Sequence, residues 1–173
     1  MVLTETGEPL FDGDPATDSS RASNPAVRPR IQSLLDEQPY AVLCVQGGGQ
    51  PYGALVAIAF SEGLRQAVFC TPMTTRKYRL LRECDHVALV IDNRSGKTNE
   101  LMDVEAVTAT GRAAFIARGR EFDHWAEVLV SRHSYLTSFV RAETCALFRV
   151  DIVRFLHVAR FQEVRQWVPT AHS

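Results

Sequence analysis

The chain has 173 residues, of which 46% are hydrophobic and 23% charged, and its formal net charge at pH 7 is −1. This composition is typical of a soluble protein with one domain and a sizeable core. The near-neutral charge argues against a nucleic-acid partner, and no apolar run reaches the ~20 residues of a membrane-spanning helix. The first residues lack the features of a signal peptide, so we expect a cytoplasmic protein with no membrane partner.

Residues 1–25 are predicted to form a flexible N-terminal arm, because they combine acids, prolines and glycines without a hydrophobic period. We expect this arm to become ordered only against a partner subunit. A helix is predicted from Pro25 to before Pro39, with Val27, Ile31 and Leu34 on one face. We place one domain at residues 26–168 and a short tail at 169–173.

The rest of the chain is rich in short apolar runs separated by turns. Gly111 interrupts one long run, as expected at the tight bend of a closed barrel. Another run loses its alternation at Ile152 and Val153, which predicts a bulge or bend. The predicted strands are 40–45, 52–60, 65–70, 86–91, 104–116 and 145–158.

Two further helices are predicted, one ending near Cys84 and one long helix from Gly119 to Val140 with apolar residues at helical spacing. Six strands, mostly in hairpin order, with two or three helices predict a mainly β fold. We expect a small antiparallel barrel with helices packed outside it. A doubly wound sheet is disfavoured, because strands and helices do not alternate strictly.

The stretch from Phe69 to Lys77 joins an apolar strand to a helix and places two cations, Arg76 and Lys77, in the first helical turn. Cations at that position cost a few tenths of a kcal/mol each, up to about 1 kcal/mol. A bound anion would reverse this cost, because backbone N–H groups, hydroxyls and cations would converge on it. The stretch therefore predicts a phosphate clamp, which we define as residues 71–77.

A simpler interpretation of the clamp is that Thr74 or Thr75 caps the helix while Arg76 and Lys77 are merely solvated. On the residues alone, the two interpretations are about equally good. Cys70 next to the clamp is either a reactive thiol or, as its strand position favours, a buried one.

The histidines form no metal-binding or catalytic pattern in the sequence. His133 is predicted to be a satisfied core or interface residue, because it continues the apolar stripe of the long helix. Trp125 on that helix is assigned to the core. For Trp167, interface packing and stacking on a ligand both remain open.

Several stretches resemble the pyridoxamine 5′-phosphate oxidase-like, FMN-binding split-barrel family over roughly residues 27–168. The resemblance is carried by Pro51–Val56, Phe69–Thr71, Thr75–Lys77, Leu80–Leu81 and His86–Ile91. It implies a six-stranded split barrel that dimerises, with FMN in clefts at the interface of a homodimer. The phosphate of FMN is a phosphomonoester that carries nearly two negative charges at neutral pH. A guanidinium and an ammonium group together match that charge.

Carried over to this sequence, the resemblance implies that Arg76 and Lys77 bind the FMN phosphate, with Thr71, Thr74 and Thr75 supplying hydroxyl or backbone donors. It also implies that the isoalloxazine ring is lined, largely through backbone groups, by Ala54, Leu55 and Val56. No side chain is assigned as a general acid or base, and no metal site is predicted.

We therefore expect an FMN-binding oxidoreductase that acts on a small molecule. Three alternatives remain: a non-catalytic flavin-binding or sensing dimer, a deazaflavin-dependent relative, and a haem-related split-barrel protein.

Overall fold

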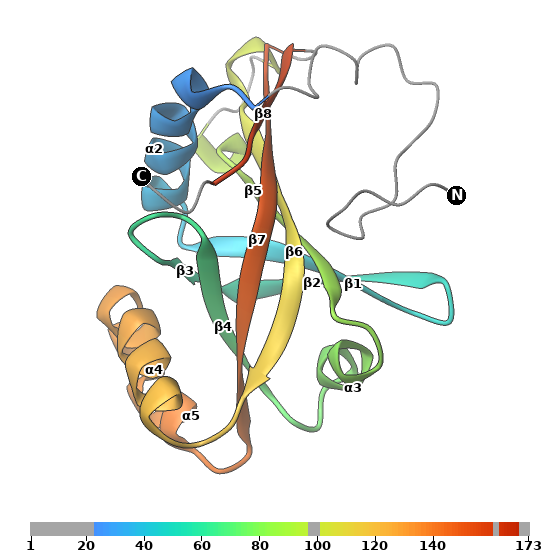
Figure 1. Cartoon of the computed structure of the whole chain (residues 1–173), viewed down its shortest axis with the longest axis vertical. Helices are drawn as coiled ribbons and strands as arrows, with labels where there is room; N and C mark the ends of the chain where they lie inside the picture. Colours follow the sequence, from blue (N-terminus) through green and yellow to red (C-terminus); the bar gives the residue numbers. More distant parts are fainter. Residues whose placement is uncertain (1–22, 97–100, 161–162, 170–173) are drawn as a thin grey trace.

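The computed structural model describes residues 23–96, 101–160 and 163–169, so most of the predicted arm and of the tail lies outside the described residues. One curled antiparallel sheet dominates the fold, with helices packed around it (Figure 1). This confirms the predicted mainly β barrel with flanking helices. The strands are β1 (Tyr40–Gly47), β2 (Gln50–Ala57), β3 (Ala59–Phe60), β4 (Gln66–Pro72), β5 (His86–Asp92), β6 (Ala106–Ile116), β7 (Cys145–Ala159) and β8 (Glu163–Trp167).

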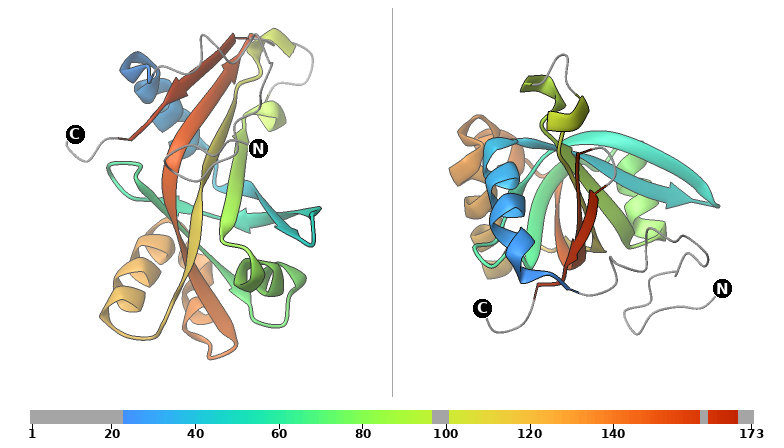
Figure 2. Two further views of the ribbon diagram at one scale, coloured as in Figure 1. Left: turned by 45° about the vertical axis from the view of Figure 1, so that its right-hand side comes forward. Right: turned by 90° about the horizontal axis from the view of Figure 1, so that it is seen from above.

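The strand order is β2-β1-β5-β6-β7-β4-β3, with β8 pairing with β7. The strand predicted at 52–60 is divided at Ile58 into β2, which pairs with β1, and β3, which pairs with β4. One continuous stretch of chain thus joins the two ends of the strand order, and the sheet curls on itself (Figure 2).

The predicted bulge lies at Val153. Thr110 pairs with Arg154 and Gly111 pairs with Ile152, so Val153 is an extra residue on β7. The bend brings β7 very close to Gly111, where an added Cβ would lie 2.3 Å from the carbonyl oxygen of Asp151. Glycine is needed here for close backbone approach.

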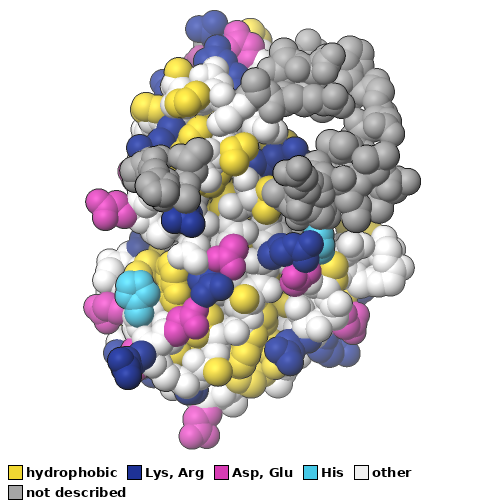
Figure 3. Space-filling view, viewed as in Figure 1, with side chains coloured by type: hydrophobic (Ala, Val, Ile, Leu, Met, Phe, Trp, Pro, Cys, Tyr) yellow, Lys and Arg dark blue, Asp and Glu magenta, His cyan; other side chains and the backbone are white. Residues whose placement is uncertain are grey.

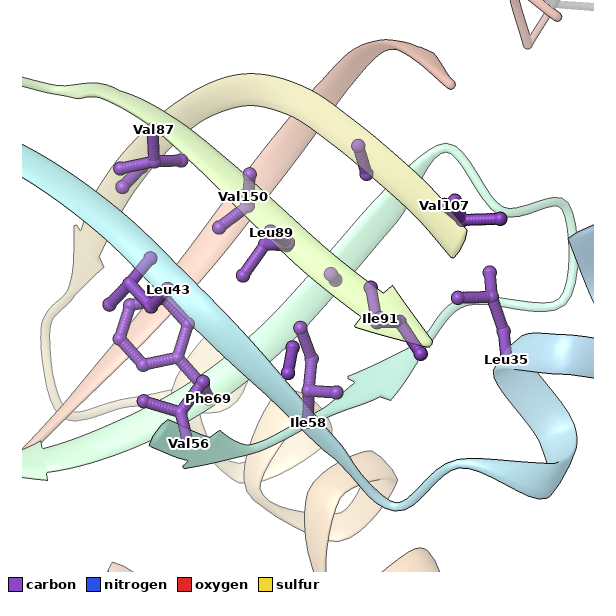
Figure 4. Packing of buried hydrophobic residues seen from close by; sticks show 14 of the residues in the cluster. Leu35, Leu43, Val56, Ile58, Phe69, Val87, Leu89, Ile91, Val107 and Val150 are labelled. Atoms are coloured by element: carbon purple, nitrogen blue, oxygen red, sulfur yellow. The ribbon is translucent and has the colours of Figure 1, made fainter. Parts of the chain in front are cut away.

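The core lies inside the curl, where side chains from both ends of the strand order meet. Phe69 of β4 packs face to face on Phe148 of β7, with ring centres 5.6 Å apart. Leu43 of β1, Leu89 of β5 and Ile58 are buried in the same cluster (Figure 4). Buried residues alternate with partly exposed ones along β5, which shows that one face of the sheet supplies this core.

Helices cover the sides of the barrel. A 3-10 turn η1 (Pro25–Val27) leads into α2 (Arg28–Glu37), and α3 (Arg76–Glu83) begins with the last two residues of the clamp. Next come α4 (Arg120–Arg132), η4 (Ser134–Leu136) and α5 (Thr137–Arg141), while η2 (Arg94–Gly96) and η3 (Leu101–Asp103) flank residues outside the described part. None of the described helices has the length and apolar character that crossing a membrane requires.

The prediction of one long helix over 119–140 is wrong, because the chain leaves the helix at His133, where φ is −129° and ψ is 69°. Directly before the break, the Arg132 guanidinium reaches the C-terminal end of α2 and donates to the carbonyl oxygens of Leu35, Asp36 and Gln38. These carbonyls have no acceptor role within their own helix. At the point where α4 ends, the chain is therefore held by contacts with α2.

The tail contributes a strand that the sequence did not predict. Trp167 of β8 is buried and lies 5.4 Å from the Phe155 ring, centre to centre, at an interplanar angle of 21°. The guanidinium carbon of Arg28 in α2 lies over the Trp167 ring, 5.7 Å from its centre. Core packing thus accounts for Trp167, and Trp125 is buried as predicted.

Candidate phosphate-binding site

Thr75 is the N-cap of α3. Its Oγ1 accepts a hydrogen bond from the backbone N–H of Tyr78 (3.3 Å) and donates to the carbonyl of Pro72 (2.9 Å). The single proton of Thr75 is therefore used, so Thr71 Oγ1 donates to Thr75 Oγ1 across 3.0 Å. Thr71 is 1% exposed. Both hydroxyls shape the clamp from within, and neither is free to be the main donor to a ligand.

The groups that the clamp exposes are Thr74, Arg76 and, in part, Lys77. Among the described residues, no carboxylate lies within 4.0 Å of either cation, and the first turn of α3 holds no acid. The N–H groups at the first two positions of a helix have no acceptor inside the helix. The helix start therefore presents donors and positive charge without an anion of its own.

Arg76 is not merely solvated. Its guanidinium carbon lies 5.2 Å from the centre of the Tyr52 ring on β2, a cation–π contact. A second contact holds α3 close to β1, because an added Cβ on Gly47 would lie 2.3 Å from Leu80 Cδ2. The structure thus brings the clamp beside β2, the strand that carries the predicted ring-lining residues.

Those three residues do not share a face. Ala54 and Val56 lie opposite Leu43 and Ala41 on the inner side of the sheet, whereas Leu55 points outward and is 67% exposed. However, β2 is an edge strand that pairs with β1 alone in the strand order. One of its edges therefore keeps backbone N–H and C=O groups for a ligand, which suits lining through the backbone.

Cys70 is partly buried, so its strand position does not bury the thiol completely. A hydrogen bond with the Cys145 thiol on β7 and burial both raise the pKa of the Cys70 thiol. A raised pKa leaves little thiolate at neutral pH, so Cys70 is a poor nucleophile. Both cysteines are free.

His133 is a satisfied buried histidine, as predicted. Its Nε2 donates to the carbonyl of Ile58 (2.9 Å), and its Nδ1 lies within hydrogen-bond distance of the Tyr135 hydroxyl (3.2 Å). The Tyr40 ring stacks on it at 6.3 Å. Among the described residues, no group of three or more histidine, cysteine or acidic side chains is arranged to hold a metal ion.

A polar cavity of about 610 Å³ lies away from the clamp, between α2 and the ends of β7 and β8. In its wall, His157 Nε2 donates to Glu105 (3.0 Å), and Arg30 pairs with the same carboxylate. Burial alone would raise the pKa of Glu105, but the hydrogen bond from His157 and the charge of Arg30 outweigh it and hold the pKa below its usual value. The other two arginines of the wall both pair with Glu163. The guanidiniums of this cavity are thus matched by its own carboxylates.

Two features of these sites were missed in the sequence. Tyr52 lies within the Pro51–Val56 stretch, but nothing in its spacing from Arg76 reveals that they touch. The Glu105–His157 pair joins residues 52 positions apart, and only the pairing of β6 with β7 brings them together.

Solved structures similar to this chain include haem-binding and flavin-binding proteins. A haem-binding protein from Mycobacterium smegmatis gives a TM-score of 0.74 at 14% identity, over 86% of this chain and 60% of that chain. The haem storage protein HutZ from Vibrio cholerae gives 0.60 at 15% identity, over 75% and 82%. A FAD-binding protein from Mesorhizobium loti gives 0.60 at 17% identity, over 74% and 91%.

At such identities these likenesses show the fold alone, and the chain spans about three fifths of the length of the Mycobacterium smegmatis protein. No curated protein matches the chain. The family model for pyridoxamine 5′-phosphate oxidase matches residues 27–167. Because this match covers most of the chain, the protein belongs to the pyridoxamine 5′-phosphate oxidase family.

Proposed function

We propose that this protein binds FMN, with the phosphate at the clamp and the isoalloxazine ring along β2, and that it is an oxidoreductase of a small molecule. The observation that carries the proposal is the contact between Arg76 and Tyr52. The Arg76 guanidinium, which has no carboxylate partner among the described residues, thus lies beside the edge strand, so that one ligand with a phosphate at one end and a flat ring at the other can engage both.

The exposure of each clamp residue indicates which group it would offer to the phosphate. Arg76 supplies a planar guanidinium that matches two phosphate oxygens, and Lys77 adds a point charge. Thr74 and the free backbone N–H groups at the start of α3 supply neutral donors. Thr71 and Thr75 hold the turn in shape through their mutual hydrogen bond.

Bound FMN would supply the hydride or electron transfer. The residues of this chain would bind and orient it: β2 supplies backbone groups along one edge, and buried Val56 backs the strand with the barrel core. No described side chain is assigned a proton-transfer role.

We also propose that the functional unit is a homodimer in the cytoplasm. The outward face of the β1–β2 hairpin exposes Leu55 (67%) and Tyr40 (45%), and Val42 lies between them on the same face. A second copy would bury this surface and add a second wall beside β2. Leu55→Arg is expected to give a monomer in light scattering after size exclusion, and a wild-type monomer would contradict the proposal.

The deciding experiment is the spectrum and the FMN affinity of the purified protein. Absorbance near ~450 nm supports a flavin, and FMN titration should show saturable binding. Arg76→Ala combined with Lys77→Ala should weaken FMN binding by about 2–4 kcal/mol, on the scale of charge-assisted hydrogen bonds. The matched control, Arg65→Ala with Arg141→Ala, removes two exposed cations elsewhere. Equal affinities in the two double variants would refute the clamp.

The similar haem-binding structures favour haem as a second candidate ligand. An intense absorption band near ~400 nm on haem addition, without FMN binding, would support it. Flavin that binds but is reduced by neither NADH nor NADPH would instead support a non-catalytic binding or sensing role. Binding of a deazaflavin in preference to FMN would identify the third alternative.

A further inference from the structure

The helix after the clamp carries an unusual concentration of positive charge. Most described arginines have a partner: a carboxylate, as in Arg112 with Asp85, or backbone carbonyls, as in Arg132. The other described arginines have no carboxylate within 4.0 Å among the described residues and no bond to a carbonyl. They and the clamp lysine are Arg28, Arg65, Arg76, Lys77, Arg79, Arg82, Arg120 and Arg141.

Half of that set lies on α3, and we call Arg76, Lys77, Arg79 and Arg82 the α3 patch. All but Lys77 are exposed, and Lys77 is half-exposed. Glu83 on the same helix lies within 4.0 Å of none of these cations. Figure 3 shows dark blue side chains at the lower right of the molecule, where α3 lies in Figure 1. The patch extends over two helical turns, farther than one phosphate group requires.

The sequence holds a segment of opposite charge. Residues 1–22 contain five acids against one arginine. Apolar Leu10 and Phe11 stand in the middle of the acidic positions. The acids of this segment are Glu5, Glu8, Asp12, Asp14 and Asp18.

The segment is long enough to reach the patch. The described chain starts at Ser23, whose Oγ accepts a hydrogen bond from the N–H of Val168 just after β8. Twenty-two residues span at most about 75 Å, whereas a compact domain of this size has a radius of gyration of about 15 Å. The distance from β8 to α3 therefore does not limit contact.

We propose that the acidic segment 1–22 docks on the α3 patch and competes with the phosphate ligand for Arg76 and Lys77. The tether makes the binding intramolecular, so weak exposed ion pairs act at a high effective concentration. Docking of this kind is sensitive to salt, because the screening length falls from about 30 Å at 0.01 M to about 8 Å at 0.15 M. The competition, though not the docking, rests on the proposed phosphate site.

The docking is testable by zero-length cross-linking of the full chain with a carbodiimide, which joins a carboxylate directly to an amine. The sequence has two lysines, Lys77 in the patch and Lys97 outside the described residues. We expect cross-links from Lys77 to acids of residues 1–22 at 10 mM NaCl, stronger than any from Lys97. They should be lost at 0.5 M NaCl.

Matched charge variants sharpen this test. Arg79→Gln with Arg82→Gln should reduce the Lys77 cross-link at least threefold, and Arg120→Gln with Arg141→Gln should leave it unchanged. Equal yields at Lys77 and Lys97, or equal yields in the two double variants, would overturn the docking. Retention on a single-stranded oligonucleotide column without a Lys77 cross-link would overturn it in favour of a nucleic-acid partner.

The competition is tested by neutralising the segment with Glu5→Gln, Glu8→Gln, Asp12→Asn, Asp14→Asn and Asp18→Asn. This variant should bind FMN roughly threefold to tenfold more tightly than wild type at 10 mM NaCl and equally at 0.5 M. Equal affinity at both salt concentrations would overturn the competition. If neither protein binds FMN, the proposed function fails while the cross-link still decides the docking.

Discussion

The Arg76 guanidinium lies over the Tyr52 ring at 5.2 Å and so connects the first turn of α3 to the edge strand β2. Both residues are at least partly exposed. The contact holds the long arginine side chain in one direction before any ligand arrives, which lowers the entropy lost on binding.

Replacing Tyr52 should therefore affect the clamp. Tyr52→Leu is expected to weaken FMN binding by about 0.5–1 kcal/mol, the size of an exposed cation–π contact, whereas Tyr52→Phe keeps the aromatic face and should bind like wild type. Isothermal titration with FMN measures both. In the Arg76→Ala background Tyr52→Leu should have no further effect, and a full additional loss there would contradict the coupling.

Thr75→Ala should destabilise the protein by about 1 kcal/mol, because Tyr78 N–H loses its cap acceptor and Thr71 its hydroxyl partner. Thr75→Ser keeps the hydroxyl oxygen and should retain most of the wild-type stability. Urea unfolding measures this free energy. Thr74→Ala is the control, since Thr74 is exposed; a loss equal to that of Thr75→Ala would refute the cap.

Gly111→Ala should destabilise the protein by about 3 kcal/mol or prevent folding, because its Cβ would meet the Asp151 carbonyl oxygen at 2.3 Å. Gly63→Ala is the matched control: there the new Cβ would first meet the Arg65 side chain, at 3.9 Å. Urea unfolding, or soluble yield if the variant does not fold, compares the two. Similar stabilities would show that the bulge tolerates a side chain.

Glu105 should make stability depend on acid pH. Its folded-state pKa is lowered, so the carboxylate stabilises the fold above its unfolded pKa of about 4.3, and this contribution is lost as the pH falls through the folded-state pKa. Glu105→Gln should cost about 1–3 kcal/mol at pH 7, and the difference from wild type should shrink towards pH 3.

Urea unfolding at pH 7, 5, 4 and 3 measures this dependence. Glu62→Gln, at an exposed turn residue, is the control and should change nothing. A Glu105→Gln deficit that is the same at every pH would show that packing, and not the charge, is responsible.

The predicted fold is confirmed because its main signals are local. The alternation along β5, the glycine in β6 and the loss of phase at Val153 each reflect a nearby backbone constraint. The error at 119–140 has a distant cause. His133 has helical neighbours and apolar spacing, but its ring bonds to Ile58 and Arg132 reaches α2, and such contacts override local preference.

The candidate site likewise combines local features, which the sequence reveals, with a long-range contact, which it does not. The end of β4 at Pro72, the cap at Thr75 and the two cations that follow are neighbours in the chain, so the sequence alone brings them together at one helix start. The prediction that groups Ala54, Leu55 and Val56 ignores the alternation of a strand, which turns the Leu55 side chain away from the other two. The contact of Tyr52 with Arg76 could not be predicted from the sequence, because it depends on how the sheet curls.

The stretch from β2 to β3 has a consequence for how the protein folds. These two strands are neighbours in the chain but stand at opposite ends of the strand order, so each can pair only once its own partner, β1 or β4, is in place. Between β1 and β4 lie β5, β6 and β7, and the pairings that connect β1 to β4 through them are all long-range. Folding rates fall as such distant pairings dominate. We therefore expect a slow, all-or-none transition, in which no part of the barrel is stable before residues 50–60 join its two halves.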